Sequence, residues 1–469
     1  MSYQEFISRK LCLVPPSGLA DVPPLAGPLF PHQKALTAWA LKRGRAAIFA
    51  DTGLGKTRME LAWAEAVARV TGRQVLILTP LAVAAQMLRE ADVMGIHACV
   101  IREPEDQARA PICIVNYERV HKVDVSALAG VVLDESSIIK HHTAKTLALL
   151  MQTFRATPYK LCATATPAPN DWTELGNHAE FLGICSRPEM LAEYFCHDGG
   201  ETQVWRLKGH ARAQFWRWVS TWGAMVQSPA DLGFDDSAYA LPPLDVSEHR
   251  IEVSAAAAAA AAAAGTLFAL EASTLTERRE AKRGSLDARV EACADLVNSD
   301  QQPWIVWCEL NAEADALRKA IPGSVEVRGS DDADEKEKRL TAFAAGSIRV
   351  LITKSSIAGF GLNWQHCCRM AFVGLTDSYE SYYQAVRRCW RFGQTKPVHV
   401  HLFAGALEGS ILRNLQRKEA DAKAMALELS RETHDAVMAE VIGQQQRETN
   451  TYTAAKRISA PAWLVSEAA

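Results

Sequence analysis

Short apolar runs recur along this chain in two groups of five, and stretches with helical spacing of apolar residues separate them. Uninterrupted apolar strands that alternate with helices are typical of a parallel sheet covered on both faces. The pattern therefore predicts an α/β fold with two domains, each built on a mainly parallel sheet covered by helices. The first group comprises Ala46–Ala50, Val75–Thr79, Ile112–Asn116, Val131–Leu133 and Leu161–Thr164, and the second comprises Trp304–Cys308, Val325–Arg328, Val350–Thr353, Met370–Val373 and Val398–Phe403.

The same pattern divides the chain into five segments. Between the two groups of runs the sequence is first rich in Trp and then in Ala, so we expect a helical accessory region and linker there. The expected segments are an N-terminal extension (1–25), a first α/β domain (26–174), the accessory region (175–290), a second α/β domain (291–420) and a C-terminal helix and tail (421–469).

Composition limits the classes of protein that this chain can be. Hydrophobic residues make up 48% of its 469 residues, which excludes a mainly disordered chain. The 51 Lys and Arg against 54 Asp and Glu give a net charge of -3. Any surface for a polyanion therefore has to be a local stripe of cations.

Two features concern the compartment in which the protein works. The first residues lack the apolar core of a secretory signal, and the eleven Cys include no CxxC pair, which favours reduced thiols in a cytoplasm. Val253–Leu270 carries no charge, but it contains an unbroken run of ten Ala, which have little apolar area. We therefore expect a helix outside the membrane and no transmembrane segment.

The segment Ala50–Thr57 (ADTGLGKT) has the spacing of a phosphate-binding loop, although Ala50 stands in place of the first Gly. A strand precedes the segment and a helix follows it, as such a loop requires. Backbone N–H groups of the loop can turn toward phosphates, the Lys56 ammonium adds a positive charge, and the Thr57 hydroxyl can hold Mg²⁺. The residues expected to cradle the phosphates are Thr52, Gly53, Leu54, Gly55, Lys56 and Thr57.

Two acidic residues, Asp134 and Glu135, end the apolar run Val131–Leu133. This arrangement can place one carboxylate on a metal ion and the next against a water molecule. We expect Asp134 to anchor Mg²⁺ and Glu135 to orient or deprotonate the nucleophile. Upstream, Gln33 stands where the chain enters a helix, and its amide can pair with the edge of adenine.

Further motifs give the chain a specific resemblance to helicase superfamily two, and within it to the Swi/Snf family of double-stranded DNA translocases. The resemblance covers roughly residues 29–420 and is most specific in Gln384–Lys396 (QAVRRCWRFGQTK), which is similar to the family's QAxDRxxRxGQTK. The other motifs are Thr164–Asn170 (TATPAPN), Glu174–Leu175, Phe181–Leu182, Arg328–Ser330, Ile352–Lys354 and Ala358–Asn363.

The resemblance implies two RecA-like domains that close on ATP and Mg²⁺. Gln33 would then read adenine, and Lys56, Thr57, Asp134 and Glu135 would bind and hydrolyse ATP together with Gln384 and Gly361. Arg388 and Arg391 would be arginine fingers that reach the γ-phosphate. Thr164 and Thr166 would couple hydrolysis to movement. The implied contacts to DNA are Thr79, Pro80, Asn116, Tyr117, Thr353 and Asn363.

The chain also departs from the family pattern. Ser137 stands where the family has His, so the link from hydrolysis to movement would run through Ser137 or be weaker. Arg387 replaces the acid before the first finger, so an ion pair is either missing there or made elsewhere. The compact chain resembles bacterial or phage-encoded relatives more than chromatin remodellers.

Aromatic and basic residues alternate in Trp205–His210 and Phe215–Trp218, and Trp222 follows. Such a segment can stack on nucleic-acid bases. Trp218 and Trp222 are four residues apart, however, and aromatic residues at that helical spacing more often pack in a core. We favour packing and keep nucleic-acid contact as the alternative.

These observations lead to one main hypothesis and two alternatives. The main hypothesis is a DNA-dependent ATPase that moves along duplex DNA in the cytoplasm of a bacterium or of a phage-infected cell. The first alternative is a strand-separating DNA or RNA helicase. The second is a nucleotide-gated DNA-binding scaffold without turnover.

Overall fold

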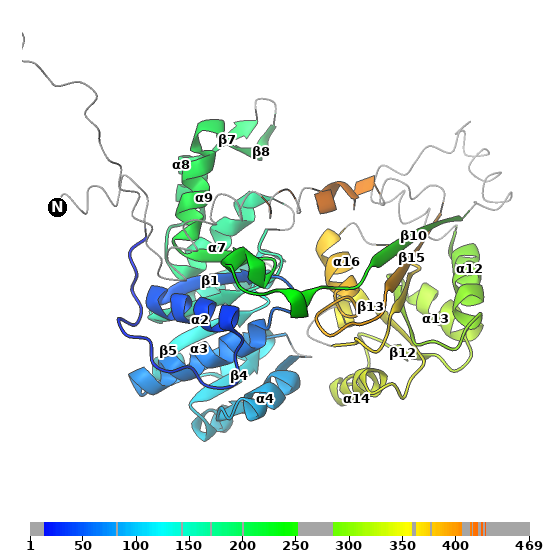
Figure 1. Cartoon of the computed structure of the whole chain (residues 1–469), viewed down its shortest axis with the longest axis horizontal. Coiled ribbons are helices and arrows are strands. Elements are labelled where there is room, and N and C mark those ends of the chain that lie inside the picture. The colour runs from blue at the N-terminus through cyan, green and yellow to red at the C-terminus, as the bar shows by residue number, and fades with distance from the viewer. Residues whose placement is uncertain are drawn as a thin grey trace, which may run out of the picture.

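A computed structural model describes most of both predicted α/β domains. The described residues are 14–80, 83–141, 144–168, 171–198, 201–251, 285–358, 363–375, 378–405, 413–414, 416–420, 424 and 427. Figure 1 shows two domains side by side.

The first domain contains a seven-stranded sheet in the order β3-β4-β2-β5-β6-β1-β9, and each neighbouring pair is parallel. Parallel pairing places the carboxyl ends of the central strands at one edge of the sheet, where ligands of α/β folds bind. The strands are β1 (Arg45–Ala50), β2 (Gln74–Thr79), β3 (Ala98–Val100), β4 (Ile112–Asn116), β5 (Leu128–Asp134), β6 (Tyr159–Ala163) and β9 (Gly223–Val226).

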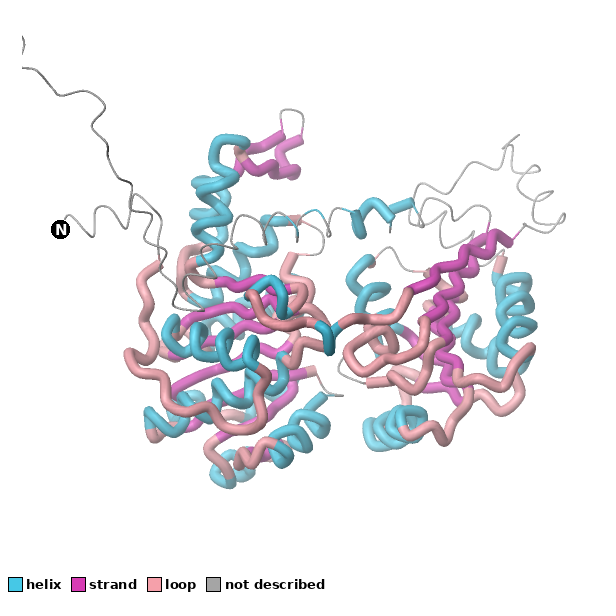
Figure 2. The backbone as a smooth tube through the Cα atoms, viewed as in Figure 1, coloured by secondary structure: helices cyan, strands magenta, loops and turns pink. Residues whose placement is uncertain are grey.

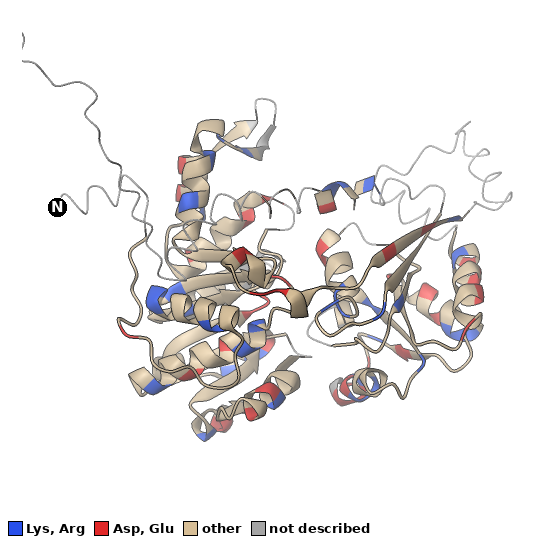
Figure 3. Cartoon of the chain, in the orientation of Figure 1, with Lys and Arg blue, Asp and Glu red and all other residues tan. Residues whose placement is uncertain are grey.

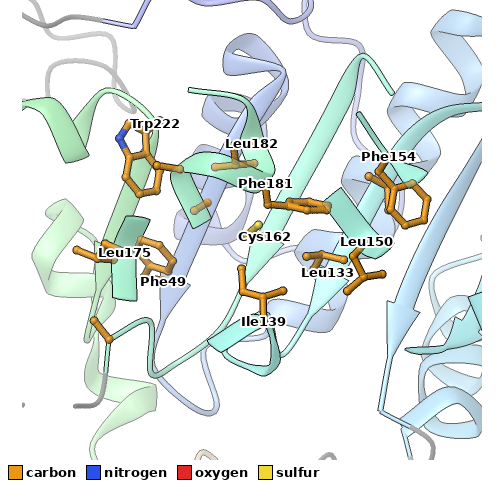
Figure 4. Close-up of a cluster of buried hydrophobic side chains, with 14 of the residues drawn as sticks. Phe49, Leu133, Ile139, Leu150, Phe154, Cys162, Leu175, Phe181, Leu182 and Trp222 are labelled. Atoms are coloured by element: carbon orange, nitrogen blue, oxygen red, sulfur yellow. The ribbon is translucent and has the colours of Figure 1, made fainter. Parts of the chain in front are cut away.

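Helices cover both faces of this sheet because alternate residues of each strand point to opposite sides. Along β1, Ala47 and Phe49 belong to one hydrophobic cluster, and Ile48 belongs to the other. Figure 4 shows Phe49 in the first cluster, which also includes Phe181. The covering helices are α2 (Pro31–Arg43), α3 (Lys56–Thr71) and α4 (Ala84–Val93) on one face and α6 (Ala144–Thr153), α7 (Leu175–Leu182), α8 (Arg187–Tyr194) and α9 (Arg212–Ser220) on the other.

The described residues of the accessory region form strands as well as helices. Strands β7 (Phe195–Asp198) and β8 (Glu201–Leu207) form an antiparallel hairpin, which Figure 2 shows at the far end of α8 and α9. The region also supplies β9 to the first sheet. A four-residue strand has too short an apolar run to be recognised, and only its pairing with β1 identifies it.

The buried aromatic residues of this region confirm the packing that we favoured. Trp216, Trp218 and Trp222 are all buried, and the Trp218 and Trp222 rings meet edge to face with centroids 5.3 Å apart. They extend the hydrophobic cluster that covers one face of the first sheet.

The second domain contains a six-stranded parallel sheet in the order β10-β15-β14-β11-β13-β12. Its two faces bear separate hydrophobic clusters, so the prediction of two helix-covered parallel sheets is confirmed. The strands are β10 (Leu244–Ile251), β11 (Trp304–Cys308), β12 (Val325–Val327), β13 (Val350–Lys354), β14 (Arg369–Phe372) and β15 (Val398–Gly405). The helices are α12 (Leu286–Asn298), α13 (Asn311–Ala320), α14 (Ala333–Ala344), α15 (Ser355–Ala358) and α16 (Tyr379–Val386), while α5 (Ile138–His141) belongs to the first domain.

Several expectations fall on residues that the structure does not describe. These are the Ala-rich run, Gly361 and most of the C-terminal segment. Within the described part of the chain, no helix is long and apolar enough to cross a membrane.

Candidate active site

The phosphate-binding loop connects β1 to α3 at the carboxyl edge of the first sheet. Gly53 and Gly55 have φ angles of 97° and 84°, which L side chains rarely adopt. A Cβ atom on Gly55 would lie 2.2 Å from Nε2 of Gln33, so only glycine fits there. The Lys56 ammonium donates to the carbonyl of Ala50 at 2.9 Å and so lies over the loop. The loop therefore offers N–H groups at a helix N-terminus and a lysine charge, which together suit a polyphosphate.

Gln33 supports the loop from α2. Its Nε2 donates to the Leu54 carbonyl at 3.0 Å, and its Oε1 accepts from the Phe30 N–H at 3.0 Å. The side chain is buried. Each end of the amide thus makes one hydrogen bond within the protein, which leaves a second N–H donor and a second lone pair on the oxygen.

An aromatic cluster that sequence reasoning missed lies beside Gln33. It joins three elements: the start of α2, the turn Ser237–Tyr239 and the loop after α16. The Tyr239 and Phe392 rings have centroids 4.7 Å apart, and Phe30 meets both rings edge to face. No local pattern links these residues, because Tyr239 lies 209 positions after Phe30, and Phe392 lies 153 positions after Tyr239. They meet only in the folded chain.

The acidic pair lies at the end of β5. The Thr79 hydroxyl at the end of neighbouring β2 donates to Oδ2 of Asp134 at 2.7 Å. Burial, and next the negative charge of Glu135, raise the pKa of Asp134 to about 7. Glu135 has a φ of 52°, and its Oε2 accepts from the Thr164 hydroxyl at 3.4 Å. Adjacent parallel strands thus bring both predicted acids and Thr164 together.

Glu60 is a further acidic residue that the sequence analysis did not single out. It lies one helical turn after Lys56 on α3 and is fully buried. Neither of its carboxylate oxygens has a hydrogen-bond partner in the described structure. Burial, followed by the charge of Asp134, raises its pKa well above the ordinary value. A carboxyl inside an otherwise apolar helical stretch was the signal that could have identified it.

Residues of the second domain reach this site through α16 and the segment after it. The Thr166 hydroxyl donates to Oε1 of Glu380 at 3.2 Å, and Nε2 of Gln384 donates to the same oxygen at 3.4 Å. Thr166 also donates its N–H to the Thr164 hydroxyl at 3.1 Å. A continuous chain of contacts therefore leads from Glu135 to the second domain.

One contact between the domains thus runs through Thr166. Ser137 is buried, and its role in the link from hydrolysis to movement stays a prediction. The hydroxyl oxygen of the neighbouring Ser136 lies 3.0 Å from Nε2 of His178 on α7.

Arg388 and Arg391 lie near the acidic pair. Burial lowers the pKa of Arg388 to about 10, while the charges of Glu135 and Asp134 oppose that shift. Burial also lowers the pKa of Arg391 to about 9, and the charges of Arg388 and Arg387 add to the effect. The charge of Glu135 therefore acts on both guanidinium groups, and the charge of Asp134 acts on that of Arg388.

Arg387 stands where the family pattern has an acidic residue, and its guanidinium pairs with an acid of the other domain. Its Nη2 lies 2.6 Å from Oδ2 of Asp51 in the phosphate-binding loop. The Tyr383 hydroxyl donates to the other carboxylate oxygen, Oδ1. The ion pair is made across the interface between the domains.

The predicted DNA contacts are mostly engaged inside the protein. Thr79, Asn116, Tyr117 and Thr353 are buried. The Tyr117 hydroxyl donates to the Asp134 carbonyl at 2.7 Å, Asn116 accepts from the Arg119 N–H at 3.0 Å, and the Thr353 hydroxyl donates to the Val327 carbonyl at 3.0 Å. These side chains cap strand ends. Pro80 and Asn363 are only partly buried.

The residues present fit a magnesium nucleotide. Thr57 and Asp134 would supply oxygen ligands of the kind that Mg²⁺ prefers, and the loop with Lys56 would cradle the phosphates. The metal would neutralise phosphate charge when bound. A nucleotide on this loop would face both domains, which is the arrangement of two-domain P-loop ATPases.

Comparison with known proteins shows which families of ATPases this chain resembles. Residues 30–175 match the family model for the DEAD/DEAH box helicase, and residues 288–393 match that for the helicase conserved C-terminal domain. The chain therefore carries the two domains that characterise helicase superfamily two. It is also 39% identical over 83 residues to the human "ATP-dependent DNA helicase Q4". That match covers 18% of this chain and 6% of the human protein.

Proposed function

We propose that this protein is an ATP-dependent translocase of the Swi/Snf type that moves on duplex DNA. The observation that carries the proposal is that the charges of Asp134 and Glu135 in the first domain act on Arg388 of the second domain, and that the charge of Glu135 also acts on Arg391. Arginines suit the charge that develops on a transferring phosphoryl group. Closure on ATP and opening after hydrolysis would then move one domain relative to the other.

The type of translocase rests on the sequence block Gln384–Lys396, which resembles the Swi/Snf signature. Lys and Arg are interspersed with Asp and Glu on the helices of both domains (Figure 3). This distribution supports a track held by a few local cations and backbone groups, because phosphate contacts need not come from a wholly basic face.

The test is steady-state phosphate release without nucleic acid and with single-stranded DNA, duplex DNA or duplex RNA. We expect strong stimulation by duplex DNA and its loss in Glu135→Gln and Lys56→Ala variants. Stimulation by single strands or RNA alone would contradict the duplex track. A Lys56→Ala variant that hydrolyses ATP as fast as the wild type would contradict the ATP site itself.

A strand-separating helicase is the second candidate function. The match to a human protein named a DNA helicase favours it. Displacement of a third strand from a triplex without unwinding of the duplex would support translocation, whereas displacement of a duplex strand would support unwinding. A DNA complex retained with ATP but without phosphate release would instead indicate a nucleotide-gated scaffold.

A further inference from the structure

The contact between Arg387 and Asp51 joins two residues that are 336 positions apart in the sequence. Asp51 lies in the phosphate-binding loop, and Arg387 directly precedes the finger Arg388. The Asp51 carboxylate has donors on both oxygens: Arg387 on Oδ2, and the Thr52 N–H at 2.6 Å together with the Tyr383 hydroxyl on Oδ1. Two of these three donors come from the second domain.

The ion pair is largely shielded from water. The side chains of Arg387 and Asp51 are 11% and 20% exposed. The Arg387 guanidinium also lies over the rings of Trp390 and Tyr383, at 4.5 Å and 5.1 Å from their centroids. Removal of one member of such a pair leaves the other charge buried without compensation. The contact is thus a fixed feature of the interface and differs from an exposed ion pair.

Asp51 also offsets part of the positive charge of the segment that contains the three arginines. Arg387, Arg388 and Arg391 lie within five residues, and each positive charge disfavours the others. The family pattern has an acid at position 387, which this chain lacks. Asp51 provides a negative charge for the segment from the opposite domain.

We propose that Arg387 is a positioning residue that docks the finger segment onto the phosphate-binding loop through Asp51 and so sets Arg388 for ATP hydrolysis. The proposal rests on the proposed ATPase function. The contact that holds Arg387 also constrains the backbone of the next residue, Arg388. A group that is already in place to stabilise the transition state accelerates a reaction because it does not have to reorganise.

Two neighbouring contacts support the same docking. A Cβ atom on Gly53 would lie 3.1 Å from the backbone N of Phe392, so the loop and the finger segment approach closely. Thr166 contacts Glu380 one turn before Tyr383 on α16. Of these three contacts, the one between Arg387 and Asp51 is an ion pair.

The experiment is a double-mutant cycle with Asp51→Asn, Arg387→Gln and the combined variant. Each single substitution should lower kcat for ATP hydrolysis by roughly 10- to 100-fold, because misplacement by about 1 Å costs about 10²-fold. The combined variant should be no slower than the slower single variant, because the same contact is lost. Arg387→Lys, which keeps the charge, should recover part of the rate.

The variants should also separate positioning from nucleotide binding. Arg387→Gln should lower kcat while the affinity for a fluorescent ATP analogue changes little. The matched control is Arg250→Gln on β10, because Arg250 is 81% exposed in the same domain. Multiplicative losses in the combined variant, a wild-type rate in Arg387→Gln, or an equal loss of nucleotide affinity would each overturn the proposal.

Small-angle scattering without nucleotide provides a readout that does not require turnover. Asp51→Asn and Arg387→Gln should increase the radius of gyration relative to the wild type and Arg250→Gln, since the docked interface loosens. If the wild type does not hydrolyse ATP, the proposed function fails, but scattering still tests the docking contact. An unchanged radius in both variants would contradict docking through this pair.

Discussion

His249 and His401 face each other on the neighbouring strands β10 and β15, with Nε2 of the first 3.0 Å from Nδ1 of the second. Burial lowers the pKa of His401 to about 4, and the positive charges of His249, His399 and Arg369 contribute to the shift. Asp245 also belongs to this group, 3.4 Å from His399. The native state therefore binds fewer protons at His401 than the unfolded chain does between about pH 4 and pH 6.5.

This difference predicts that the second domain loses stability in acid. Because the unfolded chain takes up the additional proton, the free energy of unfolding falls as pH decreases from about 6.5 through about 4. In a His401→Asn variant, the melting temperature should fall less over this window than in the wild type. His210→Asn, at an exposed position, is the control. Parallel wild-type and His401→Asn curves would count against the prediction.

The burial of Glu60 near the candidate active site could not be predicted from its residue type. A Glu in a helix is usually solvated, yet this one is buried beside Asp134 without a hydrogen-bond partner in the described structure. Its environment depends on the packing of α3 against the sheet, where Trp63 and Val67 lie against Gly130 of β5. No pattern along the helix encodes that environment.

At the scale of elements, α9 and β9 bind the accessory region to the first domain. Trp222 precedes β9, is fully buried and meets Phe49 of β1 edge to face at 6.2 Å between centroids. The hairpin β7–β8 carries Trp205, which is only partly buried and contacts His197 with ring centroids 3.9 Å apart and ring planes tilted by 38°. The two tryptophans therefore have different energetic roles.

Trp222→Ala should destabilise the protein by about 3–5 kcal/mol, since it removes a large buried side chain and leaves a cavity. Trp205→Ala should cost less than about 1 kcal/mol, because its ring is partly solvated. Denaturant unfolding of the two variants provides the comparison. Equal losses of stability would show that the Trp222 site is not the better packed of the two.

At the scale of the whole molecule, the active site is divided between the domains. The phosphate-binding loop and the acidic pair belong to the first domain, while Arg388 and Arg391 belong to the second. Binding and hydrolysis should therefore be separable. In the proposed mechanism, the first domain holds the nucleotide, and the arginines stabilise the charge that develops on the transferring group.

Arg388→Ala should reduce ATP hydrolysis by roughly 10³- to 10⁵-fold, the range associated with loss of an arginine finger. The affinity for a fluorescent ATP analogue should change little, whereas Lys56→Ala should weaken it. Arg318→Ala, at an exposed position on α13, serves as the control. Hydrolysis by Arg388→Ala at close to the control rate would exclude Arg388 as the finger.

The two parallel-sheet domains and the candidate phosphate-binding loop could be predicted from the order of residues along the chain. Strand runs, helical spacing and the positive-φ glycines are properties of neighbouring residues, so they can be read along the chain. The order of Asp134 and Glu135 after a strand is equally local, and it placed both acids at the carboxyl edge of the sheet.

The contacts between residues far apart in the sequence could not be predicted in this way and became known from the folded chain. The fold paired Arg387 with Asp51, placed β9 beside β1, gathered Phe30, Tyr239 and Phe392, and buried Thr79 and Thr353 where backbone contacts to DNA had been expected. The physical reason is that burial and charge pairing depend on distance in space. Residue type fixes what a side chain can do, and packing fixes which partner it reaches.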